Sequence, residues 1–190
     1  MSDFYRAIDV VLRHEGGWVH DPDDPGGETN FGLSMLMIQR EGLTPLDLGL
    51  PDFEPGRLKE LKLERAKEIY RRLFWDRYHL ERIHDQASAT KVFDCGVNCG
   101  PPRAAMLAQQ AAIVCGQWVV VDGILGPESF DAINACGRAA YLSAYAEEMA
   151  GYYRALVERR PVLKKFLRTW LLRAAWPGLV LQPVAPKGTS

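Results

Sequence analysis

Three side chains near the N-terminus have the types that chemistry on a sugar linkage needs, namely Glu15, Asp24 and Thr29. They lie within residues 14–33, which read H-E-G-G-W-V-H-D-P-D-D-P-G-G-E-T-N-F-G-L. A protonated carboxylic acid can pass its proton to the leaving oxygen of a glycosidic bond. A second carboxylate, with a hydroxyl beside it, can hold a water for attack or stabilise a positively charged sugar ring. The set therefore indicates hydrolysis of a glycosidic bond.

An amphipathic helix is expected to lead into this stretch and to position Glu15. Its apolar side chains recur at helical spacing: Phe4, Ile8, Val11 and Leu12. The same stripe continues onto Glu15, and Gly16-Gly17 then ends the helix. Burial and the negative end of the helix dipole both favour the protonated acid. We expect Glu15 to lie where water and counter-charge are scarce; the alternative is that the helix ends a turn early and leaves Glu15 solvated.

The loop after Glu15 should return its other polar groups to the acid. Residues 21–27 are dense in turn formers, and residues 29–34 read as a short extended segment. With residues 17–20 opposite, this segment predicts a small β-hairpin over the helix end. The hairpin would bring Asp24 and Thr29 toward Glu15.

The same loop partly matches a calcium-binding EF-hand loop. Asp21, Asp23 and Gly26 fit the first, third and sixth positions. Pro25 fails at the fifth, and Gly32 fails at the twelfth, where a bidentate Glu is needed. We therefore expect no metal, and nothing else in the sequence calls for a cofactor.

The quoted stretch resembles the signature of the N-acetylmuramidases of glycoside hydrolase family 108, which include phage endolysins and bacterial relatives, some labelled secretion activators. The Glu of the family's E-G-G motif is catalytic and corresponds to Glu15. The Glu–Asp–Thr order is also similar to the triad of phage-type lysozymes, with the same eight residues between Glu15 and Asp24 but one residue fewer between Asp24 and Thr29. The resemblance implies cleavage of the β-1,4 bond between N-acetylmuramic acid and N-acetylglucosamine in peptidoglycan glycan strands.

Two further segments offer candidate substrate-binding residues. Residues 91–100, K-V-F-D-C-G-V-N-C-G, are similar to the family's F-D-x-x-V-N-x-G segment and place Asp94 and Asn98 one helical turn apart. These two side chains are expected either to bind sugar or to serve as a structural polar pair. A helix predicted over residues 63–78 carries Tyr70 and Trp75, whose rings would either stack on sugar or belong to the core.

The pattern predicts a mainly α, lysozyme-like helical body with a small β-hairpin at the active-site cleft. We divide it into a lysozyme-like catalytic region (1–90), a helical peptidoglycan-binding-like region packed into the same body (91–176) and a flexible tail (177–190). The second region contains V-D-G-I-L-G-P at residues 121–127, which resembles a repeat of peptidoglycan-binding domains. A protein that grips glycan without cutting it is the alternative function, and a regulator of secretion is a third.

Composition bounds the remaining possibilities. With 190 residues and a net charge of -1, the chain has no strong basic field, so we expect no nucleic-acid partner. No apolar run is long enough for a stable membrane span, and no signal peptide is visible. We expect a monomer made in the cytoplasm that acts on the cell wall in the periplasm, and the family resemblance suggests release through a holin-type pore. The cysteines at 95, 99, 115 and 136 lack zinc-site spacing and should be reduced.

Overall fold

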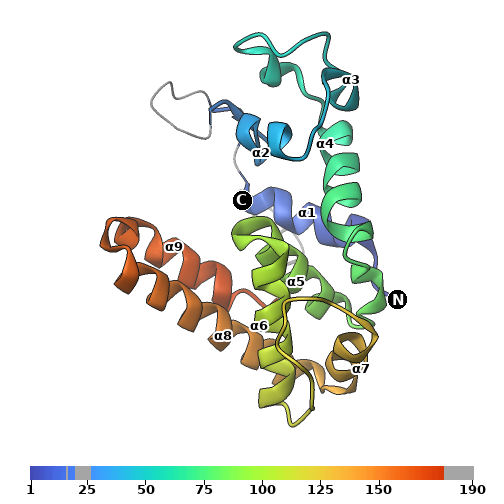
Figure 1. The fold of residues 1–190 in the computed structure, drawn as a ribbon, viewed down its shortest axis with the longest axis vertical. Helices are drawn as coiled ribbons and strands as arrows, with labels where there is room; N and C mark the ends of the chain where they lie inside the picture. Colours follow the sequence, from blue (N-terminus) through green and yellow to red (C-terminus); the bar gives the residue numbers. More distant parts are fainter. Residues whose placement is uncertain (16, 20–26, 178–190) are drawn as a thin grey trace, which may run out of the picture.

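The computed structural model describes residues 1–15, 17–19 and 27–177. Within them the chain is mainly helical, with one short antiparallel hairpin, as the sequence predicts (Figure 1). The elements of the first half are α1 (Phe4–His14), β1 (Thr29–Asn30), β2 (Leu33–Ser34), α2 (Met35–Arg40), α3 (Pro45–Leu48), η1 (Arg57–Glu60), α4 (Leu63–Tyr70), η2 (Arg71–Asp76) and η3 (Leu80–Arg82). Those of the second half are α5 (Gln86–Cys99), α6 (Pro101–Val114), α7 (Pro127–Ala135), α8 (Arg138–Arg159), η4 (Pro161–Leu163) and α9 (Lys164–Ala175).

Helix α1 is stabilised by a capped N-terminus and by an apolar face that is buried in the core. Asp3 caps its N-terminus by accepting a hydrogen bond from the Arg6 backbone N–H at 2.9 Å. Phe4, Ile8 and Val11 are buried, as their spacing predicts. The helix ends at His14, so that Glu15 is its C-cap residue.

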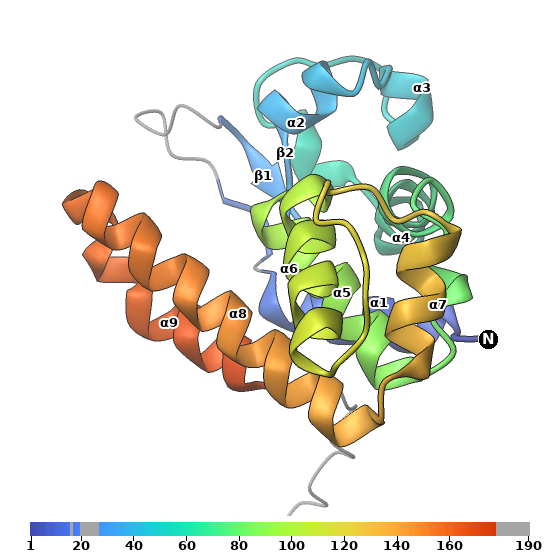
Figure 2. The same cartoon turned by 60° about the horizontal axis from the view of Figure 1, so that its bottom comes forward.

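Helix α5 is the centre of the molecule. It packs against α1, α6 and α8, and small residues along it, such as Ala89 and Gly96, allow these neighbours to approach (Figure 2). Side chains from both halves of the chain join one hydrophobic cluster around Phe93. Apolar side chains from both halves of the chain therefore share one core.

The helix predicted over residues 63–78 changes its winding part of the way along. Regular α4 ends at Tyr70, and η2 continues as a π-helix to Asp76. In a π-helix the backbone hydrogen bonds span five residues in place of four. The rings of Tyr70 and Trp75 both lie against Phe93, with ring centroids 6.4 and 5.6 Å from it.

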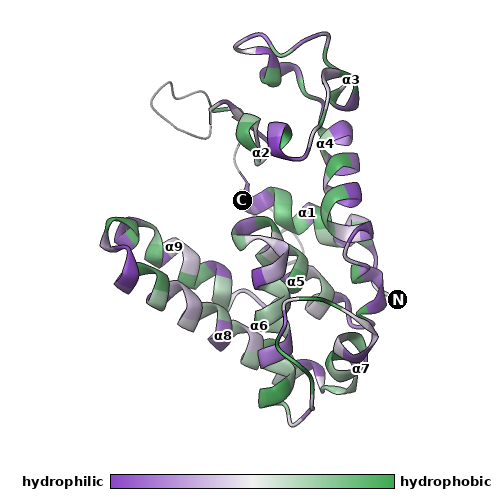
Figure 3. Cartoon of the chain, in the orientation of Figure 1, coloured by the Kyte–Doolittle hydropathy of each residue, from purple (hydrophilic) through white to green (hydrophobic). Residues whose placement is uncertain are grey.

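Helices α8 and α9 form a long antiparallel pair that extends from the body (Figures 1 and 2). Purple and green segments alternate along both helices in Figure 3, as expected for helices with one exposed face. The far end of α9 returns to the body, where the buried Lys91 of α5 donates hydrogen bonds to the carbonyl oxygens of Ala174 and Trp176. None of the helices in the described ranges has the length and hydropathy that crossing a bilayer requires.

Replacing Lys91 by Met should change how stability depends on pH. Burial lowers the pKa of Lys91 to about 8, from an ordinary value near 10.5. Between these two values the unfolded chain binds more protons than the folded chain, so the Lys91 contribution to the free energy of unfolding rises with pH. The free energy of unfolding of the wild type, minus that of Lys91→Met, should therefore increase from pH 8 to pH 10.5.

Urea unfolding at half-unit pH steps measures this difference. Lys165→Met is the matched control because Lys165 is exposed on α9. A difference for Lys91→Met that stays flat or narrows over the same range would show that the amine is not desolvated at the α5–α9 junction.

Candidate active site

Glu15 lies at the point where α1 ends and the chain turns away. Its backbone is extended, and its N–H still donates to the Val11 carbonyl at 3.2 Å, so the helix holds the residue firmly. Its side chain is 20% exposed. The acid is thus half-buried at a helix C-terminus, in the position that the apolar stripe predicts.

The hairpin beside Glu15 is tighter than the sequence predicts. Residues 29–34 do not form one extended segment, because the chain reverses at Phe31-Gly32 and pairs Asn30 with Leu33. Both turn residues have positive φ, 49° and 78°, as a type I′ turn requires. The predicted partner segment is present as well, since Val19 and Thr29 exchange backbone hydrogen bonds of 2.8 and 2.9 Å.

The hairpin turn lies directly against the acid. A Cβ atom placed on Gly32 would stand 2.7 Å from Glu15 Oε2 and 2.5 Å from the Tyr70 hydroxyl oxygen. That hydroxyl donates to the Phe31 carbonyl oxygen at 2.9 Å. Burial, with the nearby Glu15 charge, raises the pKa of Tyr70, so the phenol stays a donor and fixes the turn. Only glycine fits this contact.

A positive charge also reaches Glu15, and here the prediction of scarce counter-charge is wrong. Arg173 of α9 donates from Nη2 to Glu15 Oε1 at 3.0 Å. The same guanidinium donates to both carboxylate oxygens of Asp94, from Nε and from Nη2, each at 2.8 Å. His14 Nδ1 lies 2.9 Å from Asp94 Oδ1. Four side chains from α1, α5 and α9 therefore form one charged network.

The network compensates for the burial of its members. Burial alone would raise the pKa of Asp94, but the hydrogen bonds from His14 and Arg173 hold that pKa below its usual range. Burial likewise opposes the charge of Arg173, yet Asp94 and then Glu15 raise its pKa above the ordinary value. Asp94 is 1% exposed and Arg173 is 10% exposed. Because each supplies a partner for the other, both remain ionised although they are buried.

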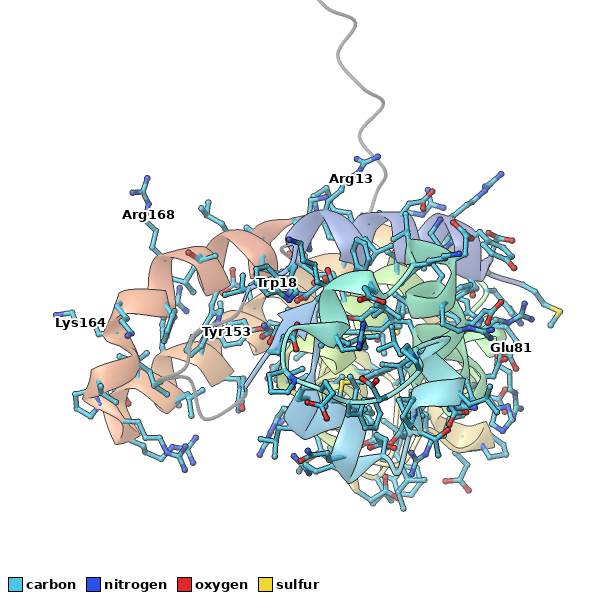
Figure 4. The ribbon with its side chains drawn as sticks, turned by 90° about the horizontal axis from the view of Figure 1, so that it is seen from above. Arg13, Trp18, Glu81, Tyr153, Lys164 and Arg168 are labelled. Carbon is cyan, nitrogen blue, oxygen red and sulfur yellow. The ribbon has the colours of Figure 1, made fainter. Side chains whose placement is uncertain are left out.

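A second buried carboxylate, that of Glu28, lies directly before β1 and connects the hairpin to neighbouring segments. It accepts hydrogen bonds from the Trp18 indole N–H and from the Gly56 backbone N–H, the latter at 3.1 Å. Trp18, which is labelled in Figure 4, is 39% exposed. The Lys59 ammonium lies 5.2 Å from its ring centroid. The sequence analysis did not select Glu28 or Trp18 as site residues. Their position within the quoted motif, residues 14–33, is the feature that could have identified them.

The structure places only some of the other predicted site residues near Glu15. Asp24 lies outside the described residues. Thr29 is partly buried on β1. Asp94 faces the charged network, and Asn98 Oδ1 accepts a hydrogen bond from the Tyr153 hydroxyl at 2.8 Å. Tyr70 and Trp75 are buried in the hydrophobic core, so neither presents a ring face to solvent.

Among the described residues, no group of three or more His, Cys, Asp or Glu side chains is arranged to hold a metal ion. The four cysteines have free thiols. Cys95 and Cys99 lie one turn apart on α5, with their sulfur atoms 3.3 Å apart. The charged network is therefore the chemically distinctive feature of the described structure.

The helical body and hairpin define a mainly α, lysozyme-like fold with an acid at its helix end. Residues 8–100 match the family model described as "Glycosyl hydrolase 108", and residues 103–175 match the model described as "Predicted Peptidoglycan domain". The chain therefore consists of a glycosyl hydrolase 108 domain followed by a peptidoglycan-binding-like domain. This pair of domains supports a peptidoglycan hydrolase of the glycoside hydrolase class.

Comparison with solved structures supports the fold over nearly the whole chain. The structure titled "Structure of Brucella abortus SagA" is similar with a TM-score of 0.69 and 22% sequence identity, covering 90% of this chain and 89% of that one. A search of curated proteins finds no significant match. The two family models meet between residues 100 and 103, whereas the sequence analysis divides the regions at residue 91.

Gly32→Ala should destabilise the protein more than the same change at Gly42. Both glycines have positive φ, so either alanine pays a backbone penalty of about 1–2 kcal/mol. At Gly42 the added methyl group meets nothing within 4 Å, but at Gly32 it meets the Glu15 and Tyr70 side chains. Urea unfolding of both variants measures the difference, and equal losses would show that the hairpin turn does not press on the acid.

Proposed function

We propose that the protein is an N-acetylmuramidase that hydrolyses the β-1,4 bond between N-acetylmuramic acid and N-acetylglucosamine in peptidoglycan, with Glu15 as the general acid. The observation that carries the proposal is the position of Glu15. It lies within the stretch that matches the glycosyl hydrolase 108 model, fixed at the end of α1 and still partly exposed. A proton donor needs both properties, because it must be held in place and must touch the substrate.

The reaction follows from this placement. The Glu15 carboxyl group gives its proton to the glycosidic oxygen as the bond from that oxygen to C1 of the muramic acid ring breaks. A water molecule adds its oxygen to C1 and loses a proton to a carboxylate. The products are a new reducing end on muramic acid and a free hydroxyl group on the neighbouring sugar. No metal or cofactor takes part.

Asp24 and Thr29 are proposed to complete the site. Asp24 would act as the base or as the electrostatic partner of the sugar cation, and Thr29 would position the water or the loop. The pairing of Thr29 with Val19 holds β1 beside the helix end, which supports its inclusion. Asp94 and Asn98 would serve the substrate site indirectly, since Arg173 and Tyr153 occupy their oxygens.

The exposed ring of Trp18 is a better candidate for stacking on sugar than the buried rings of Tyr70 and Trp75. Trp18 lies within the motif, three residues after Glu15. We propose that it lines the glycan path, while Tyr70 and Trp75 support the site from the core.

Glu15→Gln should fold normally and lose at least about 100-fold in activity, because the amide cannot donate a proton to the leaving oxygen. Purified peptidoglycan is digested, and the soluble muropeptides are analysed by mass spectrometry. Glu147→Gln, on the exposed face of α8, is the matched control and should keep wild-type activity.

Three outcomes would reject the proposal. Cleaved peptide stems in place of reducing-end muramic acid would show that the protein cuts peptide bonds and not glycosidic bonds. Full activity in Glu15→Gln would show that Glu15 is not the general acid. A wild type that sediments with peptidoglycan but releases no fragments would instead favour the alternative of a binding protein that does not cut.

A further inference from the structure

Arg173 brings a residue of the second domain into the site of the first. It lies on α9, within the stretch that matches the peptidoglycan domain, and 158 residues after Glu15. Its side chain is only 10% exposed. Its hydrogen bonds to the described residues of the first domain go to carboxylates and to the backbone of Asp94.

The geometry requires a guanidinium. Nε and Nη2 hold the two oxygens of Asp94, while Nη2 also reaches Glu15. A planar fork of several fixed donors can serve two carboxylates at once, whereas a lysine ammonium is a single point of charge on a flexible stem. Asp94 thus orients Arg173, and Arg173 orients Glu15.

Glu15 is confined from both sides. Its Oε2 atom lies against the Gly32 backbone at the hairpin turn, and its Oε1 atom is held by Arg173. A proton donor that shifts by about 1 Å can lose a hundredfold in rate. The contact with Arg173 therefore bears directly on where Glu15 meets the substrate.

The end of α9 is itself docked by further contacts, which fix where Arg173 lies. Lys91 binds the carbonyl oxygens of Ala174 and Trp176, and the Trp176 ring meets the His14 ring edge-on at 5.5 Å. These contacts join the last helix to α5 and to the end of α1. Movement of the second domain would consequently move Arg173 relative to Glu15.

We propose that Arg173 is a positioning residue for the hydrolysis, and that the peptidoglycan domain completes the active site of the hydrolase domain by supplying it. The inference rests on the proposed function, because the reaction that it positions is the one assigned to Glu15. It assigns the second domain a role in turnover in addition to any affinity for the wall.

Arg173→Lys and Arg173→Gln test this role on soluble glycan strands, with kcat, KM and the pH profile of kcat as readouts. Arg168→Lys and Arg168→Gln are the controls, since Arg168 is on the same helix and projects into solvent (Figure 4). We expect kcat to fall about tenfold or more in both Arg173 variants, with KM changed by less than about twofold. The Arg168 variants should match the wild type.

The pH profile separates positioning from general structural support. Among the described residues, the titratable groups that interact with Glu15, Arg173 or Asp94 include His14, Tyr70, Lys91, Cys99 and Tyr153. Arg173→Gln removes the positive charge that contacts Glu15, so the pH profile of its kcat should differ from that of the wild type. Arg173→Lys keeps the charge, so its pH profile should stay near that of the wild type while kcat remains low.

The outcomes are distinguishable from failure of the proposed function. If the wild type is active, Glu15→Gln is inactive and the Arg173 variants keep wild-type kcat and pH profiles, the positioning role is overturned and the muramidase stands. If the wild type releases no fragments, both are overturned. Should Arg173→Gln fail to fold, Arg173→Lys tests the positioning role: a lowered kcat with an unchanged KM supports it, and a wild-type kcat overturns it.

Discussion

One guanidinium balances two carboxylates at the centre of this protein, and the arrangement of the site depends on that balance. An ionised carboxylate as deeply buried as that of Asp94 would cost several kcal/mol if it had no partner. Arg173 supplies the partner and has a further hydrogen bond for Glu15. The three residues come from α5, α9 and the end of α1, so the interaction can form only when both halves of the chain are folded against each other.

The hairpin imposes the second constraint. Its turn must pass so close to Glu15 that no side chain fits at Gly32, and Phe31 adopts a left-handed conformation that is unusual for an aromatic residue. Strained backbone of this kind persists where surrounding contacts hold it, and it gathers at functional sites. Here the Tyr70 hydroxyl provides the hold by donating to the Phe31 carbonyl oxygen.

The sequence predicts local features of this structure well and distant ones poorly. Phe4, Ile8 and Val11 of α1 are buried as their spacing predicts, and Glu15 follows α1 as the apolar stripe requires, because both features depend on neighbours a few residues away. The motif also led to the hydrolase family. Arg173 could not be predicted, since its type and position look like those of any exposed basic residue on an amphipathic helix, and only the tertiary fold brings it to Asp94. The π-helical winding after Tyr70 was likewise not predicted, because the apolar spacing of residues 63–78 is that of a regular α-helix.

The most direct test of the account is the structure of the Glu15→Gln variant bound to a peptidoglycan tetrasaccharide. The account predicts a glycosidic oxygen within hydrogen-bonding distance of the residue 15 side chain, about 2.6–3.2 Å, with Arg173 still in contact with that side chain and with Asp94. A tetrasaccharide bound elsewhere on the molecule, with every glycosidic oxygen out of reach of residue 15, would contradict it.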